Sequence, residues 1–365
     1  MKNRLKNRYV VIAIVFVMLV IIVNGVTFGG YKKNAETKIG LILTGKISDQ
    51  GWNGVHYEGV SYACEDLGAE LLVKEEVLEG TGNCIEAVRE LAAEGASMII
   101  LSSYAYSEEL RDVVKEYPQI AFYGSSAENI ADNMTSYFGR MYQVRYLSGI
   151  LAGLQTKTNK IGYVAAMPNI EVNRGINAFT LGVKSVNNEA NVYVKWTNSW
   201  DDEQAERSGA AALINETGVD VLTYHQNRHY TAQVADEEGI YSIGYNEEEN
   251  GLSDNYLTAA VWNWKKLYHA IVREHILGKS NFTKSHWFGI ETGVVELSDY
   301  SAFVSHEAAE MIEKAKQDIL AGKDVFSGVI YDNEGVMRCD EGENISDEIL
   351  LERMDWYVDG VVIDE

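Results

Sequence analysis

Three residues that could bind a flat polar ligand follow the first predicted strand, at residues 38–44. Asp49, Trp52 and Asn53 fall in the segment KISDQGWN, which leads into a predicted helix. An indole offers a large π-face, and an asparagine amide carries both a donor and an acceptor, as the edge of a nucleobase does. Asp49 could instead cap the helix while Trp52 only packs against it. The clustering of all three at a strand end favours a binding site.

Two tyrosines follow the predicted strand at 97–101. Tyr104 and Tyr106 lie in the segment SSYAYSE, whose aromatic rings and acid could flank a ligand. The same rings could equally pack at a hinge between domains. Both tyrosines are therefore candidate ligand contacts, with hinge packing as the alternative.

The second half of the chain supplies the partners for these groups. Trp200 follows the predicted strand at 191–196, and we expect it to face Trp52 across a cleft, because two aromatic faces suit a flat heterocycle. Asn246 follows the strand at 241–245 and is a candidate polar contact. Trp262 follows the strand at 256–261 and could contact the ligand or belong to the core.

Short buried strands alternate with helices twice along the chain, which predicts two doubly wound α/β lobes with parallel sheets around a central cleft. In such sheets, ligands bind beyond the carboxyl ends of the strands. We expect the last segments to cross back between the lobes. The predicted division is an N-terminal segment at 1–36, a first lobe at 37–156 plus about 262–290, and a second lobe at 157–261 plus about 291–365.

The first 36 residues have the features of an export signal. Four cations precede an apolar run from Tyr9 to Phe28, and the positive-inside rule places the rest of the chain outside the cytoplasm. The run just reaches the length that spans a bilayer, and no Ala-x-Ala cleavage site follows it. We therefore expect an uncleaved anchor in the cell membrane, with a cleaved signal peptide as the alternative.

Composition and motifs exclude several function classes. The net charge is −23, and without the six cations that precede Glu36 the other 25 Lys and Arg face 54 Asp and Glu, which disfavours nucleic-acid binding. Three scattered cysteines without a CxxC pair predict buried thiols rather than a zinc site or a disulfide framework. A Cys64–Cys84 disulfide remains an alternative. The sequence contains no GxSxG, P-loop or HExxH motif, and we predict a protein that is not an enzyme and has no metal or cofactor.

Several of these segments together resemble the basic membrane protein (Bmp) family of solute-binding receptors, which includes the purine-nucleoside receptors of ABC importers. The most specific ones are Asp49-Gln50-Gly51-Trp52-Asn53, Phe138-Gly139-Arg140 with Tyr146-Leu147-Ser148-Gly149, Glu171 to Phe179, Thr197-Asn198-Ser199-Trp200, and Met354-Asp355-Trp356-Tyr357-Val358.

The resemblance implies a type I periplasmic-binding-protein-like fold and an ABC importer permease as partner. It also implies that Trp52 and Trp200 stack on a purine, which Asp49 and Asn53 then contact. Family members hold ribose with an aspartate and a lysine. The corresponding positions in this chain look like Asn246 and the segment 259–261, which contains no lysine. A free base such as adenine is therefore favoured over a nucleoside. The alternative function is that of a membrane-tethered ligand sensor with the same fold.

Overall fold

Apolar runs bounded by turn residues form the strands of the first sheet. The computed structural model describes residues 37–48, 51–127, 130–282 and 285–363. Six parallel strands make the first sheet in the order β11-β5-β4-β3-β1-β2. Their bounds are β1 (Lys38–Ile42), β2 (Glu70–Lys74), β3 (Met98–Leu101), β4 (Ala121–Ser125), β5 (Met134–Gly139) and β11 (His286–Phe288). Nearly every residue of β1, β3, β4 and β5 is buried, as expected for parallel strands covered on both faces.

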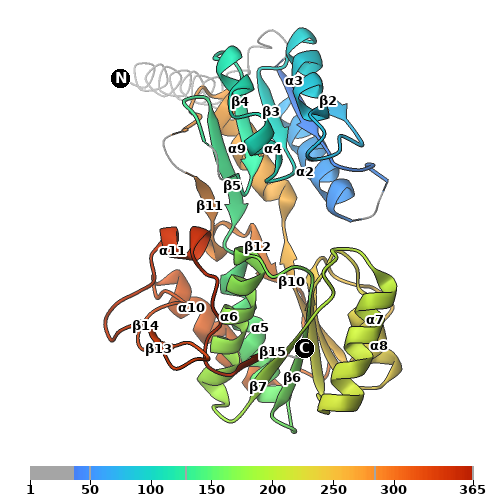
Figure 1. The fold of residues 1–365 in the computed structure, drawn as a ribbon, viewed down its shortest axis with the longest axis vertical. Helices are drawn as coiled ribbons and strands as arrows, with labels where there is room; N and C mark the ends of the chain where they lie inside the picture. The colour runs from blue at the N-terminus through green and yellow to red at the C-terminus, as the bar shows by residue number, and fades with distance from the viewer. Residues whose placement is uncertain (1–36, 49–50, 128–129, 283–284, 364–365) are drawn as a thin grey trace, which may run out of the picture. The chain divides into compact units, whose positions relative to one another are not determined.

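Helices of the first lobe flank this sheet. They are α2 (Trp52–Leu67), α3 (Asn83–Ala93), α4 (Tyr106–Glu109), the 3₁₀ turn η1 (Val113–Glu116) and α9 (Trp264–Ile276). Gly68 ends α2 in the left-handed conformation with φ 72°, and its N–H bonds to Cys64 O. Although α9 is distant in sequence, it packs against α2, and in Figure 1 it lies in orange among the blue and green elements of the first lobe.

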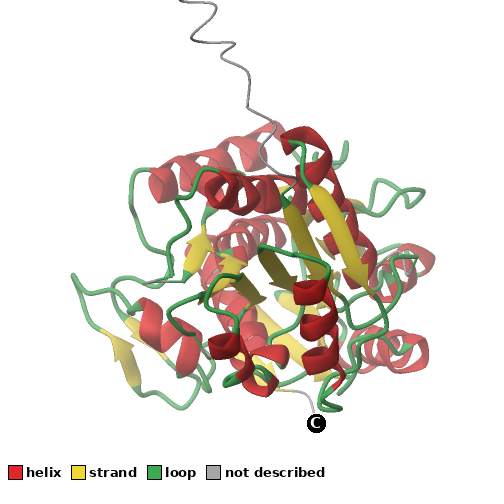
Figure 2. Ribbon diagram, turned by 90° about the horizontal axis from the view of Figure 1, so that it is seen from above, coloured by secondary structure: helices red, strands yellow, loops and turns green. Residues whose placement is uncertain are grey.

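The second sheet has seven strands, in the order β12-β10-β9-β8-β6-β7-β15, and only β12 is antiparallel to its neighbour. Its strands are β6 (Lys160–Ala165), β7 (Asn191–Trp196), β8 (Val221–His225), β9 (Tyr241–Asn246), β10 (Tyr256–Trp262), β12 (Val295–Leu297) and β15 (Val361–Ile363). The second lobe also holds α5 (Met141–Gln155), α6 (Ile170–Val186), α7 (Glu203–Ala212), the π turn η2 (Leu213–Thr217), α8 (Tyr230–Glu237), α10 (His306–Leu320), α11 (Asp347–Glu352) and the hairpin β13 (Ile330–Tyr331) with β14 (Met337–Cys339). Figure 2 shows the strands lying between helices.

Two glycines bring α5 and α6 into close contact. A Cβ atom at Gly149 would lie 2.0 Å from the backbone oxygen of Phe179, and one at Gly182 would lie 2.0 Å from the backbone oxygen of Tyr146. No side chain fits at such distances, so the two helices touch backbone to backbone. Because of this packing, α5 belongs to the second lobe.

The chain crosses between the lobes three times. It leaves the first sheet at Arg140, whereas the sequence-based division placed this boundary near residue 156, because the helix predicted at 141–155 was assigned to the first lobe. The second crossover lies at Asn263, between β10 and α9, and the third follows β11 and contains the short turn η3 (Ile290–Thr292). These two crossovers are near the predicted boundaries.

The expected α/β class with two parallel-sheet lobes is confirmed, and the differences are local. The strands β5 and β15 were not predicted, and the helix expected at 108–117 is replaced by α4 and η1. The three cysteines are free and buried, so the alternative Cys64–Cys84 disulfide is not formed. The expected membrane anchor lies outside the described residues, and no helix of the described part has the length and hydropathy to cross a bilayer.

Candidate ligand-binding site

A row of ring side chains runs from the first lobe to the second along the carboxyl ends of the strands. We call this set the aromatic row; its members in order are Trp52, Trp264, Trp262, Tyr245, His225 and Trp200. Neighbouring ring centroids are 5.4 Å and 4.7 Å apart among the first three rings, and 4.2 Å and 5.9 Å apart among the last three. A hydrogen bond of 3.4 Å from Trp262 Nε1 to the Tyr245 hydroxyl joins the two halves. The row links both candidate stacking tryptophans through contacting side chains.

The first-lobe end of the row is held by the start of α2. Trp52 is the first residue of that helix, and its Nε1 donates to the carbonyl oxygen of Ser102, directly after β3, at 2.9 Å. The ring meets His56 edge-on with centroids 4.1 Å apart. Trp52 is half-buried, and this hydrogen bond and ring contact fix its orientation.

The middle of the row is the second crossover. Trp262 ends β10, Trp264 begins α9, and Trp262 also packs on Phe138 with centroids 4.8 Å apart. A Cβ atom at Gly139 would lie 2.4 Å from the Trp262 ring, so this glycine makes room for the indole. Trp262 was a candidate contact, and the structure places it at the hinge, buried to 8% exposure.

The second-lobe end of the row is exposed. Trp200 lies in the turn after β7, keeps 36% of its surface accessible, and meets His225 edge-on. Asn198, two residues earlier, has a φ of 54°, and Asn246 at the end of β9 has a φ of 76°. Left-handed backbone outside glycine is uncommon and gathers at functional sites. Asn198 comes two residues after β7, and Asn246 is the last residue of β9, so both lie at strand ends next to members of the aromatic row.

The remaining predicted residues have different placements. Asn246 is 5% exposed, and within the described residues its Nδ2 has no hydrogen-bond partner. The Asn53 side chain is buried, and its Oδ1 accepts bonds from Thr44 Oγ1 at 3.1 Å and from the N–H of Gly45 at 3.0 Å. That oxygen holds the turn after β1. Asp49 lies outside the described residues.

The two candidate tyrosines are not part of the row. Tyr104 is 60% exposed on the surface. Tyr106 is fully buried in the apolar core of the first lobe, and its hydroxyl donates to the carbonyl oxygen of Val77. The hydroxyl is paired with protein, and Tyr106 packs in the core of the first lobe rather than at a hinge.

A charged cluster beside His225 was missed by the sequence interpretation. Burial raises the pKa of Glu171, while the positive charges of Arg174 and Arg145 oppose that rise. Burial also lowers the pKa of His225 well below its ordinary range, and Arg145 and Arg174 lower it further, so the imidazole is neutral. Glu171 Oε1 lies 3.9 Å from His225 Nε2. Glu171 lies in the first turn of α6, and His225 ends β8.

A sequence signal for this cluster did exist. The strand predicted at 219–224 ends one residue later than expected, at His225, and residues at strand ends are the ones that a parallel sheet presents to a ligand. Glu171 and Arg174 stood in a family-like segment, but spacing alone does not show which face of α6 they occupy.

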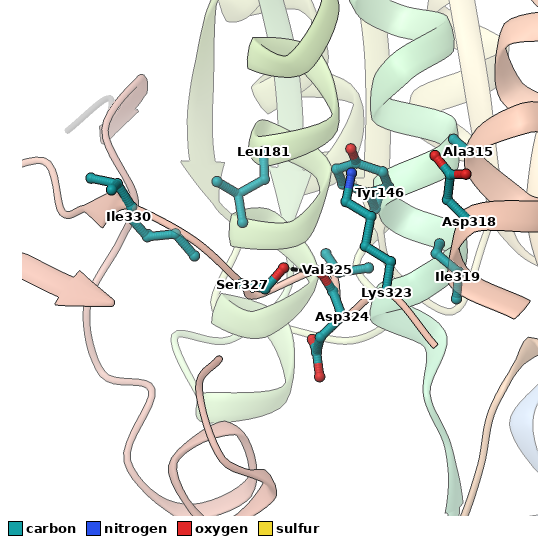
Figure 3. A pocket seen from close by; sticks show the side chains of 11 residues that line it. Tyr146, Leu181, Ala315, Asp318, Ile319, Lys323, Asp324, Val325, Ser327 and Ile330 are labelled. Atoms are coloured by element: carbon teal, nitrogen blue, oxygen red, sulfur yellow. Dashed lines mark hydrogen bonds between the residues drawn. The ribbon is translucent and has the colours of Figure 1, made fainter. Parts of the chain in front are cut away.

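Two other features of the described residues were compared with the aromatic row: possible metal-binding clusters and a small pocket in the second lobe. The described residues contain no group of three or more His, Cys, Asp or Glu that could hold a metal ion. A small pocket of about 180 Å³ lies between α5, α6, α10 and the segment after α10, as Figure 3 shows. It is lined by Tyr146, Leu181, Ile319 and Lys323 among others, none of which was predicted to bind a ligand.

The chain is similar to known solute-binding proteins over most of its length. The family model described as "ABC transporter substrate-binding protein PnrA-like" (Bmp) matches residues 36–325. The relative from Haloferax volcanii named "Putative ABC transporter glucose-binding protein TsgA13" is 32% identical, over 92% of this chain and 83% of that protein. A purine-binding protein of Brucella abortus is 31% identical, over 94% of this chain and 98% of that protein.

A solved structure shares the fold. The structure of a transcriptional activator of the comK gene from Bacillus halodurans superposes with a TM-score of 0.70 at 23% identity, over 78% of this chain and 99% of that one. At this identity the likeness concerns the fold alone. Since the family model matches residues 36–325 of the 365, the conclusion is that this chain belongs to the Bmp family of ABC transporter substrate-binding proteins.

Proposed function

We propose that this Bmp-family protein captures a free purine base, adenine being favoured, outside the cytoplasm and delivers it to an ABC importer. The observation that carries the proposal is the aromatic row, which ends in a fixed indole on the first lobe and in an exposed indole on the second. Stacking of a base on an aromatic ring contributes about 1–3 kcal/mol. A planar heterocycle gains this from each indole that it contacts.

Polar groups beside the row favour a ligand with hydrogen-bonding edges. Within the described residues, the Nδ2 of Asn246 and both ring nitrogens of His225 have no hydrogen-bond partner, although their residues are at most 5% exposed. Buried polar groups are costly unless they are paired. A purine supplies both donors and acceptors around its ring, which supports the proposal, as does the purine-binding relative from Brucella abortus.

The segment 259–261 supports a base rather than a nucleoside. It reads Ala-Ala-Val in the middle of β10, and both alanines are fully buried. Family resemblance would place a ribose-binding lysine in the segment 259–261 and an aspartate where Asn246 stands. Neither charged group is present at these positions, so the hydroxyl groups of a ribose would lose two ionic partners.

Import and anchoring complete the proposed function. The N-terminal segment 1–36 would tether a monomeric receptor to the outer face of the cell membrane beside its permease. Measuring adenine uptake in cells with and without the gene tests this step. Loss of uptake on deletion supports import, whereas unchanged uptake with intact binding would favour the tethered sensor.

Isothermal titration of the full chain in detergent micelles tests the ligand class. We expect saturable binding of adenine that is tighter than binding of adenosine or glucose. Bound ligand should also raise the melting temperature, since a ligand at 100 times its Kd stabilises the folded state by about 2.7 kcal/mol. Glucose, for which the Haloferax relative is named, is the informative competitor. Binding of glucose but of no purine would overturn the proposal.

A further inference from the structure

A carboxylate and a neutral imidazole stand side by side at the second-lobe end of the aromatic row. His225 Nε2 lies 3.9 Å from Glu171 Oε1, and the His225 ring meets Trp200 with centroids 5.9 Å apart. The His225 side chain is 3% exposed, whereas 30% of the Glu171 side chain remains accessible. Part of the Glu171 side chain is therefore accessible to solvent, close to the exposed indole of Trp200.

The two arginines near Glu171 supply positive charge while their hydrogen bonds go elsewhere. Arg145 donates from Nη1 to Thr223 Oγ1 at 3.3 Å and from Nη2 to the carbonyl oxygen of Tyr224 at 2.7 Å. Arg174 donates from Nη1 to the carbonyl oxygen of Leu350 at 2.6 Å. Burial raises the pKa of Glu171, and the two positive charges oppose that rise. In its ionised form the carboxylate accepts hydrogen bonds from a ligand through both oxygens.

His225 complements the carboxylate. A neutral imidazole has one N–H donor and one acceptor nitrogen, and the proximity of Glu171 to Nε2 favours the tautomer with the hydrogen on Nε2. An acceptor next to a donor is complementary to one particular edge of a purine. Adenine presents its N6 amine as a donor beside N7 as an acceptor, whereas a 6-oxopurine presents two acceptors there.

We propose that Glu171 and His225 recognise the amino edge of a 6-aminopurine, with the carboxylate accepting from the exocyclic amine and the imidazole Nε2–H donating to N7. The proposal rests on the proposed function, since it concerns the ligand of the same site. A 6-oxopurine would direct its carbonyl oxygen at the carboxylate, and like partial charges repel. The pair therefore sets the choice between adenine and hypoxanthine.

Titrating the wild-type full chain with adenine, hypoxanthine and N6,N6-dimethyladenine tests the ligand side. Loss of one hydrogen bond to a charged group weakens binding about 10-fold to 100-fold. We expect hypoxanthine and the dimethylated base, which has no N–H at N6, each to bind at least about tenfold more weakly than adenine. Equal affinity for all three bases would overturn the inference and leave purine capture intact, whereas binding of none would overturn both.

The Glu171→Gln variant tests the protein side. Its amide keeps the size of the side chain and can donate to a 6-oxo group, so the adenine-to-hypoxanthine affinity ratio should fall at least about tenfold. The control is Glu189→Gln, an exposed glutamate near the end of α6, which should keep the wild-type ratio. Melting curves of both variants establish that they are folded. An unchanged ratio in a folded Glu171→Gln protein would contradict the inference.

Discussion

The indole rings of Trp262 and Trp264 stack with centroids 4.7 Å apart and planes 16° from parallel, although the first ends a strand of the second lobe and the second begins a helix of the first lobe. One residue, Asn263, separates them, and its side chain caps α9 by accepting from the N–H of Lys266. The centre of the aromatic row therefore coincides with a crossover. Any change in the angle between the lobes would therefore change the packing of the two rings at the centre of the aromatic row.

Truncating the two terminal rings of the row should weaken ligand binding. Replacing Trp52 or Trp200 by alanine removes a stacking face, and we expect each change to cost about 1–3 kcal/mol of adenine binding free energy in isothermal titration. Phe303→Ala is the control, because this exposed aromatic residue of the second lobe lies outside the row. Wild-type affinity in both tryptophan variants would place the ligand elsewhere.

Two glycine-to-alanine changes should have opposite effects on the free energy of unfolding, because only one of them lies in the contact between α5 and α6. Gly149→Ala would force a Cβ atom against the Phe179 carbonyl, and overpacking of this kind lowers the free energy of unfolding by about 1–3 kcal/mol or more. Gly209→Ala, within α7, meets Lys195 Cγ only at 3.5 Å. There the better helix propensity of alanine should stabilise by up to about 1 kcal/mol. Denaturant unfolding curves compare the two, and equal effects would contradict the close approach of the helices.

The buried carboxyl of Glu206 predicts a pH-dependent stability. Burial raises its pKa to about 8 from the ordinary 4.5, and the neighbouring Asp201 and Asp202 contribute in the same direction. Between these two values the folded chain keeps a proton that the unfolded chain releases. This group's contribution to stability is therefore complete below 4.5 and is lost as the pH rises towards about 8.

The Glu206→Gln variant separates this effect from other titrations. Its amide mimics the protonated acid, so its melting temperature relative to wild type should be higher at about pH 8.5 than at about pH 5. The exposed Glu216, which follows α7, provides the control, since Glu216→Gln should shift equally at both values. A pH-independent difference for Glu206→Gln would show that the acid is not protonated in the folded state.

Replacing Arg145 by lysine should destabilise the second lobe although the charge is kept. The guanidinium donates to two acceptors and lies 4.2 Å above the Tyr245 ring, a geometry that an ammonium cannot reproduce. We expect the free energy of unfolding to fall by about 1–3 kcal/mol. Arg89→Lys, at an exposed ion pair on α3, should change it by about 0.5 kcal/mol or less, in the same denaturation experiment.

The alternation of apolar runs and helices was sufficient to predict both lobes, because most of the buried parallel strands are continuous apolar runs. The strand β5 was missed because three of the six residues in its sequence, MTSYFG, carry hydroxyl groups, so it does not read as an apolar run although the fold buries it. Gly149 stands in one of the family-like segments, and the structure shows that it allows the close approach of α5 to α6.

The candidate site could be predicted only in part. The rule that strand ends face a ligand singled out Trp52, Trp200 and Trp262, which the structure places in the aromatic row, and their contact with a ligand stays a prediction. It could not distinguish the exposed Tyr104 from the buried Tyr106, because the burial of a ring depends on how the following turn folds back. Glu171 and His225 come from distant segments, and their pairing becomes visible only in three dimensions.

The route of the chain has a consequence for how the protein acquires its structure. The first lobe needs α9 to cover α2 and β11 to extend its sheet, and both arrive after more than a hundred residues of the second lobe. A chain that emerges from its amino end cannot finish the first lobe until about residue 288 is available. Nascent intermediates therefore hold an uncovered apolar helix face for much of synthesis, the kind of surface that chaperones bind.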